Sequence, residues 1–268
     1  MRSGAKNIRT TFNAPSLTHF AGVYLFHQFL QRIQLRTYIS MQARYHQKNN
    51  HYTLSETILA LIYPMVLGLE KIEVSALLKT NGVFQYLTGI PSFPDPTTLR
   101  RFLVRAPSDL LPSLWNIHNK LRKYFIAKPL TLPSYCIDFD STANTLYGHQ
   151  EGVVKGYNPG HIGKKSYHPL VAAEAHLHDA LGGFLRYGNA HTAEGVVPLF
   201  LDIVPLLPHT KNLRSRADAG FYDKSFVKEL DARGIGFAIV AKMTAPIKRR
   251  LPGLRYHKIN SIFSTAEF

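Results

Sequence analysis

Two aspartates separated by a single residue, Asp138 and Asp140, are the pair in this sequence best placed to do chemistry. They lie in the run Cys136-Ile137-Asp138-Phe139-Asp140-Ser141-Thr142, which favours a β-strand that ends at the second aspartate. A strand projects alternate side chains from one face, so both carboxylates should point the same way. Adjacent carboxylates repel each other unless a cation or a proton lies between them, which favours a divalent metal. The alternative interpretation is that one of them caps the turn at Ser141 and Thr142.

A third aspartate, Asp218, ends a second expected strand in Leu213-Arg214-Ser215-Arg216-Ala217-Asp218-Ala219-Gly220-Phe221-Tyr222. A glycine-containing turn follows it, and a helix is expected to begin near Asp223. Metals and ligands in α/β sheets collect at the carboxyl ends of strands. If the two strands are neighbours, Asp218 should therefore meet Asp138 and Asp140.

The elements that must position these carboxylates fall into two groups. Up to about residue 129 the apolar spacing predicts helices over 16–33, 55–69, 70–79, 97–104 and 110–125, with Asn81-Gly82 as a stop and Asp95-Pro96 as a helix start. Beyond Pro129 and Pro133 it predicts strands at 135–139, 170–177, 183–187, 213–217 and 237–241, with helices at 193–206 and 223–233. The fold class is therefore α/β (α+β overall), with a basic helical domain over 1–129 and a mixed sheet flanked by helices over 130–268.

Charge points to a polyanionic partner. The chain carries 32 Lys and Arg against 17 Asp and Glu, a net charge of +15 and a pI of about 9.9. Residues 1–127 hold 15 basic and 5 acidic residues, residues 128–235 hold 11 of each, and residues 236–268 hold 6 and 1. A neutral block between basic flanks is typical of a catalytic core surrounded by DNA-binding surfaces, and nucleic acid is the usual partner of such a chain. The alternative is that the basic charge only keeps the chain in solution.

Three groups of basic residues are the candidates for contacts to DNA phosphates. A solvated helix face is the alternative for the first group and a solvated hairpin for the second. The groups are Arg100, Arg101 and Arg105; Lys164 and Lys165, in a glycine-rich loop over 155–165; and Lys248, Arg249 and Arg250.

The lone cysteine, Cys136, excludes an intramolecular disulfide and a cysteine-rich zinc site. The basic N-terminus lacks the pattern of a signal peptide, and the apolar run over 58–69 is too short to span a bilayer. These features predict a cytoplasmic protein with no membrane partner. His176 and His178 alternate along an expected strand, but no cysteines or HExxH spacing accompany them to suggest zinc.

Several motifs in a fixed order resemble the DDE transposases of bacterial insertion sequences, whose catalytic domain has an RNase H-like fold. The resemblance covers about residues 130–245 and rests on Asp138-Phe139-Asp140-Ser141-Thr142, Tyr147-Gly148-His149-Gln150-Glu151-Gly152, Gly156-Tyr157-Asn158-Pro159, Ser166-Tyr167-His168-Pro169-Leu170, Gly188-Asn189-Ala190-His191-Thr192, Arg216-Ala217-Asp218-Ala219-Gly220-Phe221-Tyr222 and Ala238-Ile239-Val240-Ala241-Lys242.

The resemblance implies that Asp140 is the first catalytic and metal-binding aspartate and Asp218 the second, with Asp138 as the alternative first ligand. It implies Mg²⁺ or Mn²⁺ as cofactor, double-stranded DNA (transposon ends and target) as partner and substrate, a homo-oligomer, and a bacterial, nucleoid-associated location. The family's final glutamate lies on a helix well downstream of Lys242. Neither Glu229 nor Glu267 has that context, so we expect a C-terminally truncated, RNase H-like domain with an incomplete triad.

Two other functions compete with transposition. A remnant that binds DNA without cutting it would need only the basic surfaces. The segment Asp138-Phe139-Asp140-Ser141-Thr142 also fits the DxDxT of haloacid dehalogenase-type phosphatases, with Asp138 as nucleophile and Asp140 as acid/base. That fold needs a later acidic pair four residues apart, whereas Asp218 and Asp223 are five apart.

Overall fold

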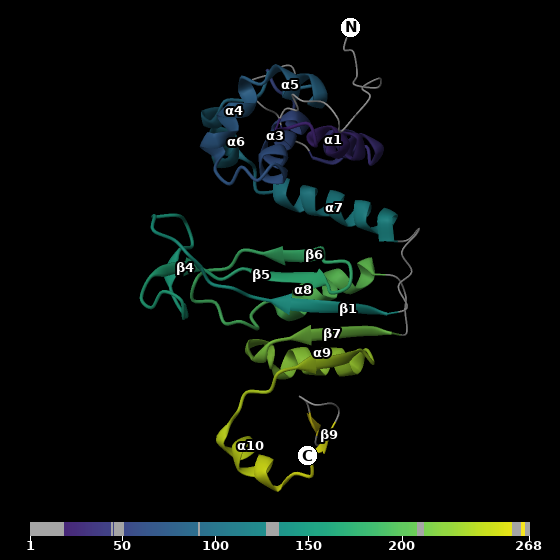
Figure 1. Ribbon diagram of the computed structural model, residues 1–268, viewed down its shortest axis with the longest axis vertical. Helices are drawn as coiled ribbons and strands as arrows, with labels where there is room; N and C mark the ends of the chain where they lie inside the picture. The colour runs from purple at the N-terminus through teal and green to yellow at the C-terminus, as the bar shows by residue number, and fades with distance from the viewer. Residues whose placement is uncertain are drawn as a thin grey trace. The chain divides into compact units, whose positions relative to one another are not determined.

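The chain divides into two compact units, residues 1–125 and 126–268 (Figure 1). The computed structural model describes residues 19–43, 45, 51–90, 92–126, 134–207, 212–258 and 264–265. No helix in this described part is long and apolar enough to cross a membrane.

Every element described in the first unit is helical. Its helices are α1 (Val23–Arg32), α2 (Leu35–Gln42), α3 (Leu54–Val66), α4 (Ala76–Lys79), α5 (Gly82–Thr88), α6 (Pro96–Arg105) and α7 (Leu110–Ile126), with a 3₁₀ turn η1 (Ile72–Ser75) before α4. Buried aromatic and aliphatic side chains from α1, α3 and α5 form one core cluster, and residues of α2, α3, α6 and α7 form a second.

Short polar residues set where these helices begin. Thr53 starts α3 with a capping box, in which its side chain accepts from the Glu56 amide and Glu56 accepts from the Thr53 amide. Asp95 caps α6 ahead of Pro96, which confirms that predicted helix start. The expected stop at Asn81-Gly82 is confirmed, because α4 ends at Lys79. The sequence analysis missed the helix that follows: the Asn81 side chain accepts from the Phe84 amide and so starts α5.

The second unit is built on a five-stranded mixed sheet with strand order β6-β5-β1-β7-β8. Its strands are β1 (Tyr135–Asp140), β5 (Leu170–Glu174), β6 (Asp179–Phe184), β7 (Leu213–Ala217) and β8 (Gly236–Ile239). β1, β5 and β6 run antiparallel in turn, whereas β7 and β8 are parallel to β1. The mixed sheet is the one that the sequence pattern predicts, and its order and directions are those of an RNase H-like sheet, as the family resemblance implies.

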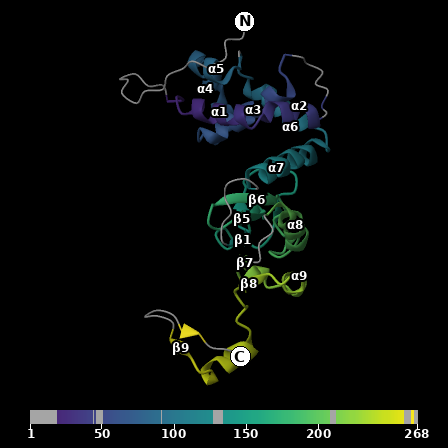
Figure 2. The same cartoon turned by 90° about the vertical axis from the view of Figure 1, so that its right-hand side faces the viewer.

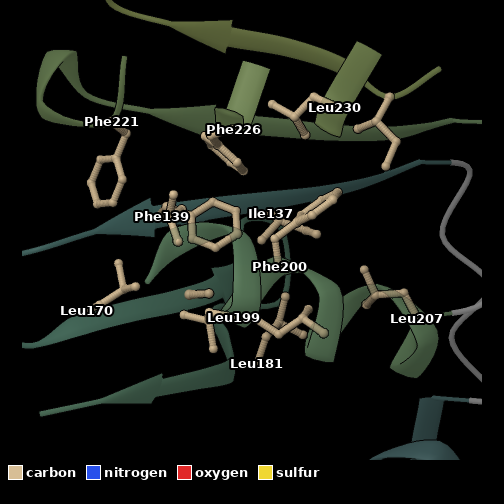
Figure 3. Packing of buried hydrophobic residues seen from close by; sticks show 14 of the residues in the cluster. Ile137, Phe139, Leu170, Leu181, Leu199, Phe200, Leu207, Phe221, Phe226 and Leu230 are labelled. Atoms are coloured by element: carbon tan, nitrogen blue, oxygen red, sulfur yellow. The ribbon is translucent and has the colours of Figure 1, made fainter. Parts of the chain in front are cut away.

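Helices α8 (Val196–Ile203) and α9 (Lys224–Ala232) cover the same face of this sheet (Figure 2). Tyr135, Ile137 and Phe139 alternate along β1 and are buried against them. Phe139 meets Phe200 of α8 and Phe226 of α9, with ring centroids 6.5 and 5.3 Å apart (Figure 3). The odd-numbered residues of β1 therefore build the core, and the even-numbered ones, including Asp138 and Asp140, face the other way.

A small three-stranded sheet, order β2-β4-β3, is inserted between β1 and β5. It consists of β2 (Asn144–Thr145), β4 (Lys165–Tyr167) and β3 (Val154–Lys155), and we call residues 142–168 the β-lobe. Figure 1 shows it beyond the end of the main sheet towards which β1 and β7 point. Gly156 and Gly188 fix its base, because a Cβ on Gly156 would lie 1.8 Å from the Gly188 carbonyl oxygen.

Two expected features of the β5–β6 region are wrong. The strand predicted over 183–187 instead ends at Phe184 and begins at Asp179. His176 and His178 do not alternate along a strand: they lie in the turn between β5 and β6, where His178 has a positive φ of 52°. Beyond β8, the described chain forms α10 (Ala245–Arg250) and pairs β9 (His257–Lys258) with β10 (Ser264–Thr265).

Candidate functional site

Asp140 and Asp218 lie at equivalent positions on neighbouring parallel strands. The register of β1 and β7 pairs Tyr135 with Leu213 and runs to Phe139 with Ala217. Asp140, the last residue of β1, and Asp218, the residue after β7, come next along the two strands. Hydrogen-bonded strands are about 4.8 Å apart, so the two exposed aspartates leave the same end of the sheet as close neighbours.

Each of the two carboxylates also holds the turn that follows it. One oxygen of Asp140, Oδ1, accepts from the Ser141 amide at 2.7 Å. Oδ1 of Asp218 accepts from the Gly220 amide at 2.8 Å and starts the short 3₁₀ turn η3 (Ala219–Phe221). The capping role that competes with metal binding is thus present, but it engages one oxygen of each group. Two exposed, hard oxygen donors on adjacent strands are a donor set suited to Mg²⁺ or Mn²⁺.

Asp138, the alternative first ligand, is engaged elsewhere. Arg216 of β7 lies directly opposite it in the register and donates from Nε to Oδ1 at 2.8 Å and from Nη2 to Oδ2 at 2.6 Å. This bidentate ion pair raises the pKa of the Arg216 guanidinium. Both carboxylate oxygens of Asp138 are therefore occupied by a fixed cation of the chain, unlike those of Asp140.

The described residues contain no group of three or more His, Cys, Asp and Glu side chains able to hold a metal ion together. Glu229, on α9, pairs with Arg233 at 2.7 Å. Glu267 lies outside the described residues. The pair of Asp140 and Asp218 is thus the part of the expected triad for which the structure gives a geometry.

A buried arginine that sequence analysis did not single out lies at the base of this site. Arg186 follows β6 and is 6% exposed. Its Nε donates to the His168 carbonyl oxygen at 2.7 Å, and its Nη2 donates to the Ser141 hydroxyl at 2.6 Å. The signal was present, because Arg186 is the only charged residue between Asp179 and Glu194, but sequence does not distinguish a buried arginine from a solvated one.

His191 shapes the loop before α8. Its Nδ1 accepts from the Ala193 amide at 3.3 Å, and it borders a shallow cavity of about 410 Å³ with Glu194 and Asp223. Asp223 caps α9. Its pKa is lowered mainly by the Ser225 hydroxyl and the Phe226 amide, with a smaller contribution from His191.

The basic residues proposed to contact DNA differ in their exposure and in their interactions with other residues of the protein. Arg100 forms an ion pair with Glu73, whereas Arg101 and Arg105 are exposed on α6. Lys164 lies 5.9 Å from the centre of the Tyr147 ring in the β-lobe, and Lys165 is paired across β4 and β3 with Lys155. Lys248, Arg249 and Arg250 are exposed in the last turn of α10.

Comparison with solved structures finds two transposase complexes among the similar chains. One is described as a piggyBac transposase synaptic complex with hairpin DNA, with 15% identity, a TM-score of 0.42, and coverage of 85% of this chain and 53% of that one. The other is the Drosophila P element transposase strand transfer complex, with 10% identity, a TM-score of 0.31, and coverage of 80% and 43%. The chain thus spans about half the length of the solved transposases it matches. No curated protein sequence gives a significant match.

The sequence family described as "Transposase DDE domain group 1" matches residues 2–261. The match includes the helical unit as well as the sheet that carries Asp140 and Asp218. The chain therefore belongs to the DDE transposases of this family.

Proposed function

We propose that the protein is a DNA transposase that performs metal-dependent DNA strand cleavage and strand transfer, with Asp140 and Asp218 as its catalytic, metal-binding aspartates. The observation that carries this proposal is their placement one residue beyond the same register pair of β1 and β7. A divalent cation bound there would activate a water or a 3′-hydroxyl and stabilise the leaving oxygen. The aspartates themselves supply negative charge and fixed oxygen ligands at the strand ends.

We assign the first position to Asp140 and a structural role to Asp138. Arg216 neutralises Asp138 and fixes its orientation. Asp138 therefore links the two strands, and Asp140 is the carboxylate left to bind a metal ion. The same pairing opposes a phosphatase mechanism, because a nucleophilic Asp138 would need an oxygen free of the guanidinium.

Double-stranded DNA, as transposon ends and target, is the proposed partner, and a homo-oligomer the proposed assembly. Among the basic groups, Lys164 and Lys165 are nearest in sequence to the site, because the β-lobe begins just after Asp140. Arg101, Arg105 and the α10 group of Lys248, Arg249 and Arg250 are further phosphate contacts. Arg100 contributes less, since Glu73 already compensates its charge. The proposed location is the bacterial cytoplasm, with the nucleoid.

Binding of Mn²⁺ to the purified chain, followed by electron paramagnetic resonance, tests the site. We expect weak binding that Asp140→Asn and Asp218→Asn each abolish. Asp202→Asn is the matched control, because Asp202 is an exposed carboxylate on α8 of the same unit. Binding that survives both Asn substitutions, or that Asp202→Asn reduces equally, would overturn the assignment.

A second function, DNA binding without cleavage, is favoured by one observation: no third carboxylate joins Asp140 and Asp218 among the described residues. A plasmid-nicking assay with Mg²⁺ or Mn²⁺, run beside a duplex-binding assay, separates the two functions. Transposase chemistry predicts metal-dependent nicking that Asp140→Asn removes while DNA binding persists. Duplex binding with no nicking under any metal condition would favour the DNA-binding function.

A further inference from the structure

The hydrogen bonds of Arg186 converge on the segments that border the two aspartates. Besides the His168 carbonyl and the Ser141 hydroxyl, its Nη1 donates to three carbonyl oxygens of the loop before α8. These belong to His191 at 3.0 Å, Thr192 at 3.0 Å and Glu194 at 2.6 Å. One buried guanidinium thus ties together the start of the β-lobe, its end and the loop that leads into α8.

On one side, the network reaches Asp140 through a single residue. The Ser141 hydroxyl accepts from Arg186 and donates to the Pro169 carbonyl oxygen at 2.8 Å, while the Ser141 amide donates to Asp140. The hydroxyl therefore fixes the backbone immediately after the first aspartate. Rotation of this turn would carry Asp140 away from the neighbouring strand end.

On the other side, the network reaches Asp218 through a packing contact. A Cβ built on Gly220 would lie 2.5 Å from Thr192 Cγ2 and 2.9 Å from Thr192 Oγ1, so Thr192 lies flush against Gly220. The Gly220 amide in turn donates to the Asp218 carboxylate. The path from Asp140 to Asp218 thus runs through Ser141, Arg186, Thr192 and Gly220.

An arginine at this buried place is selected by its many donors. Burial lowers the pKa of the guanidinium, and taking a cation out of water opposes folding unless its donors are satisfied. An apolar side chain of similar volume would avoid that cost, but it would leave the acceptors of Arg186 without a donor. What only a planar, multi-donor group provides is the simultaneous fixing of several carbonyl oxygens.

We propose that Arg186 is a positioning residue that holds Asp140 and Asp218 at the spacing needed to share one divalent cation. This inference rests on the proposed function of the two aspartates. Arg186 acts on the site through Ser141 on one side and through Thr192 and Gly220 on the other, and it contacts neither metal nor DNA. Partners that orient metal ligands affect affinity by about 10- to 100-fold when they are lost.

Mn²⁺ titration by electron paramagnetic resonance, combined with thermal unfolding, tests the proposal. We expect Ser141→Ala to weaken Mn²⁺ binding by about tenfold and Arg186→Met to weaken it further. Arg186→Lys should fall between the wild type and Arg186→Met, because a single ammonium keeps the charge but cannot reach all five acceptors. If Arg186→Met does not fold, Ser141→Ala still tests the proposal. It removes only the Ser141 hydroxyl and leaves the buried arginine in place.

Two controls separate positioning from stability. Ser215→Ala removes a buried hydroxyl on β7 that has no hydrogen-bond partner, so Mn²⁺ affinity should not change. Glu174→Gln removes a buried charge at the other end of β1, where Glu174 accepts from the Cys136, His176 and Leu177 amides. That variant should unfold at a lower temperature and bind Mn²⁺ as the wild type does.

The outcomes distinguish this proposal from the one on which it rests. One outcome would overturn the role of Arg186 alone: Ser141→Ala and Arg186→Lys bind Mn²⁺ with wild-type affinity, whereas Asp140→Asn does not bind it. The assignment of the aspartate site would then still hold. A loss in Glu174→Gln equal to that in the Arg186 variants would also overturn it, because general destabilisation would then explain both. Wild-type binding in Asp140→Asn and Asp218→Asn would remove the site and the positioning role together.

Discussion

Asp138 and Arg216 face each other across β1 and β7, joined by two hydrogen bonds of 2.8 and 2.6 Å, two residues before Asp140 and Asp218 along the same two segments. The pair places a neutralised carboxylate beside the candidate metal site. Because adjacent carboxylates repel, a free Asp138 on the same face would raise the negative charge near Asp140. Arg216 removes that repulsion and links the two strands whose ends must stay together.

The first prediction separates the two aspartates of β1. Asp138→Asn should leave Mn²⁺ binding measurable and lower the unfolding free energy by about 1 kcal/mol at most, because the pair is partly exposed. Asp140→Asn should abolish binding with little change in stability. Paired metal titrations and denaturant curves measure both effects. Equal losses of Mn²⁺ affinity in the two variants would mean that Asp138 also binds the metal.

The second prediction concerns the contact between Gly220 and Thr192. Gly220→Ala would place a methyl within 2.5–2.9 Å of Thr192 side-chain atoms, so Thr192 must move. Such overpacking costs about 1–3 kcal/mol, and the shift should also weaken Mn²⁺ binding. Thr192→Ala removes two of the three close atoms, so the double variant should recover part of both losses. Additive losses in the double-mutant cycle would contradict a direct contact.

The third prediction is a pH dependence of the helical unit. Burial, with a smaller effect of Arg36, lowers the pKa of His27 to about 4, and its ring contacts Tyr63 and Gln31. An unfolded histidine titrates near 6.5, so the folded state binds fewer protons between pH 6.5 and 4. Stability from this group is complete above pH 6.5 and is lost as the pH falls towards 4, by up to about 3 kcal/mol.

The single tryptophan reports this transition, because Trp115 lies on α7 of the same unit. Denaturant curves followed by its fluorescence should give unfolding free energies that fall across this pH window. His27→Gln should flatten the dependence. An unchanged slope in that variant would assign the effect to other groups.

Sequence patterns predicted the bounds of an element correctly where interactions between near neighbours in the sequence determine them. β7 spans the predicted residues 213–217, and Asp95-Pro96 begins α6, since strand alternation and a capping side chain depend on near neighbours. Asn81 shows the limit: it follows the end of α4 as predicted, but it also caps α5, a helix that the local pattern did not indicate and that packs Phe84 into the core.

The candidate site was predictable as two residues but not as a network. Asp140 and Asp218 could be placed at strand ends because parallel neighbours end at one edge. The partner of Asp138 depends on the pairing of β1 with β7, and the partners of Arg186 depend on the position of the loop before α8. Both are contacts between residues far apart in the sequence. The separation of Arg186 from Ser141 is 45 residues, too far for any local pattern to indicate the contact.

The last prediction concerns the β-lobe and unpaired DNA. Tyr147 and Tyr157 are 80% and 75% exposed, and Lys164 lies over the Tyr147 ring. Exposed aromatic rings beside lysines bind unpaired bases by stacking, worth about 1–3 kcal/mol per base, while lysines contact phosphates. Tyr147→Ala should therefore weaken binding of duplexes with a single-stranded end more than that of blunt duplexes. Tyr86→Ala, an equally simple change at a 52% exposed tyrosine on α5, is the control. Fluorescence-anisotropy titrations measure the affinity for each DNA. Equal losses of affinity for both DNAs would contradict stacking, and would mean that Tyr147 acts only by holding Lys164 in place.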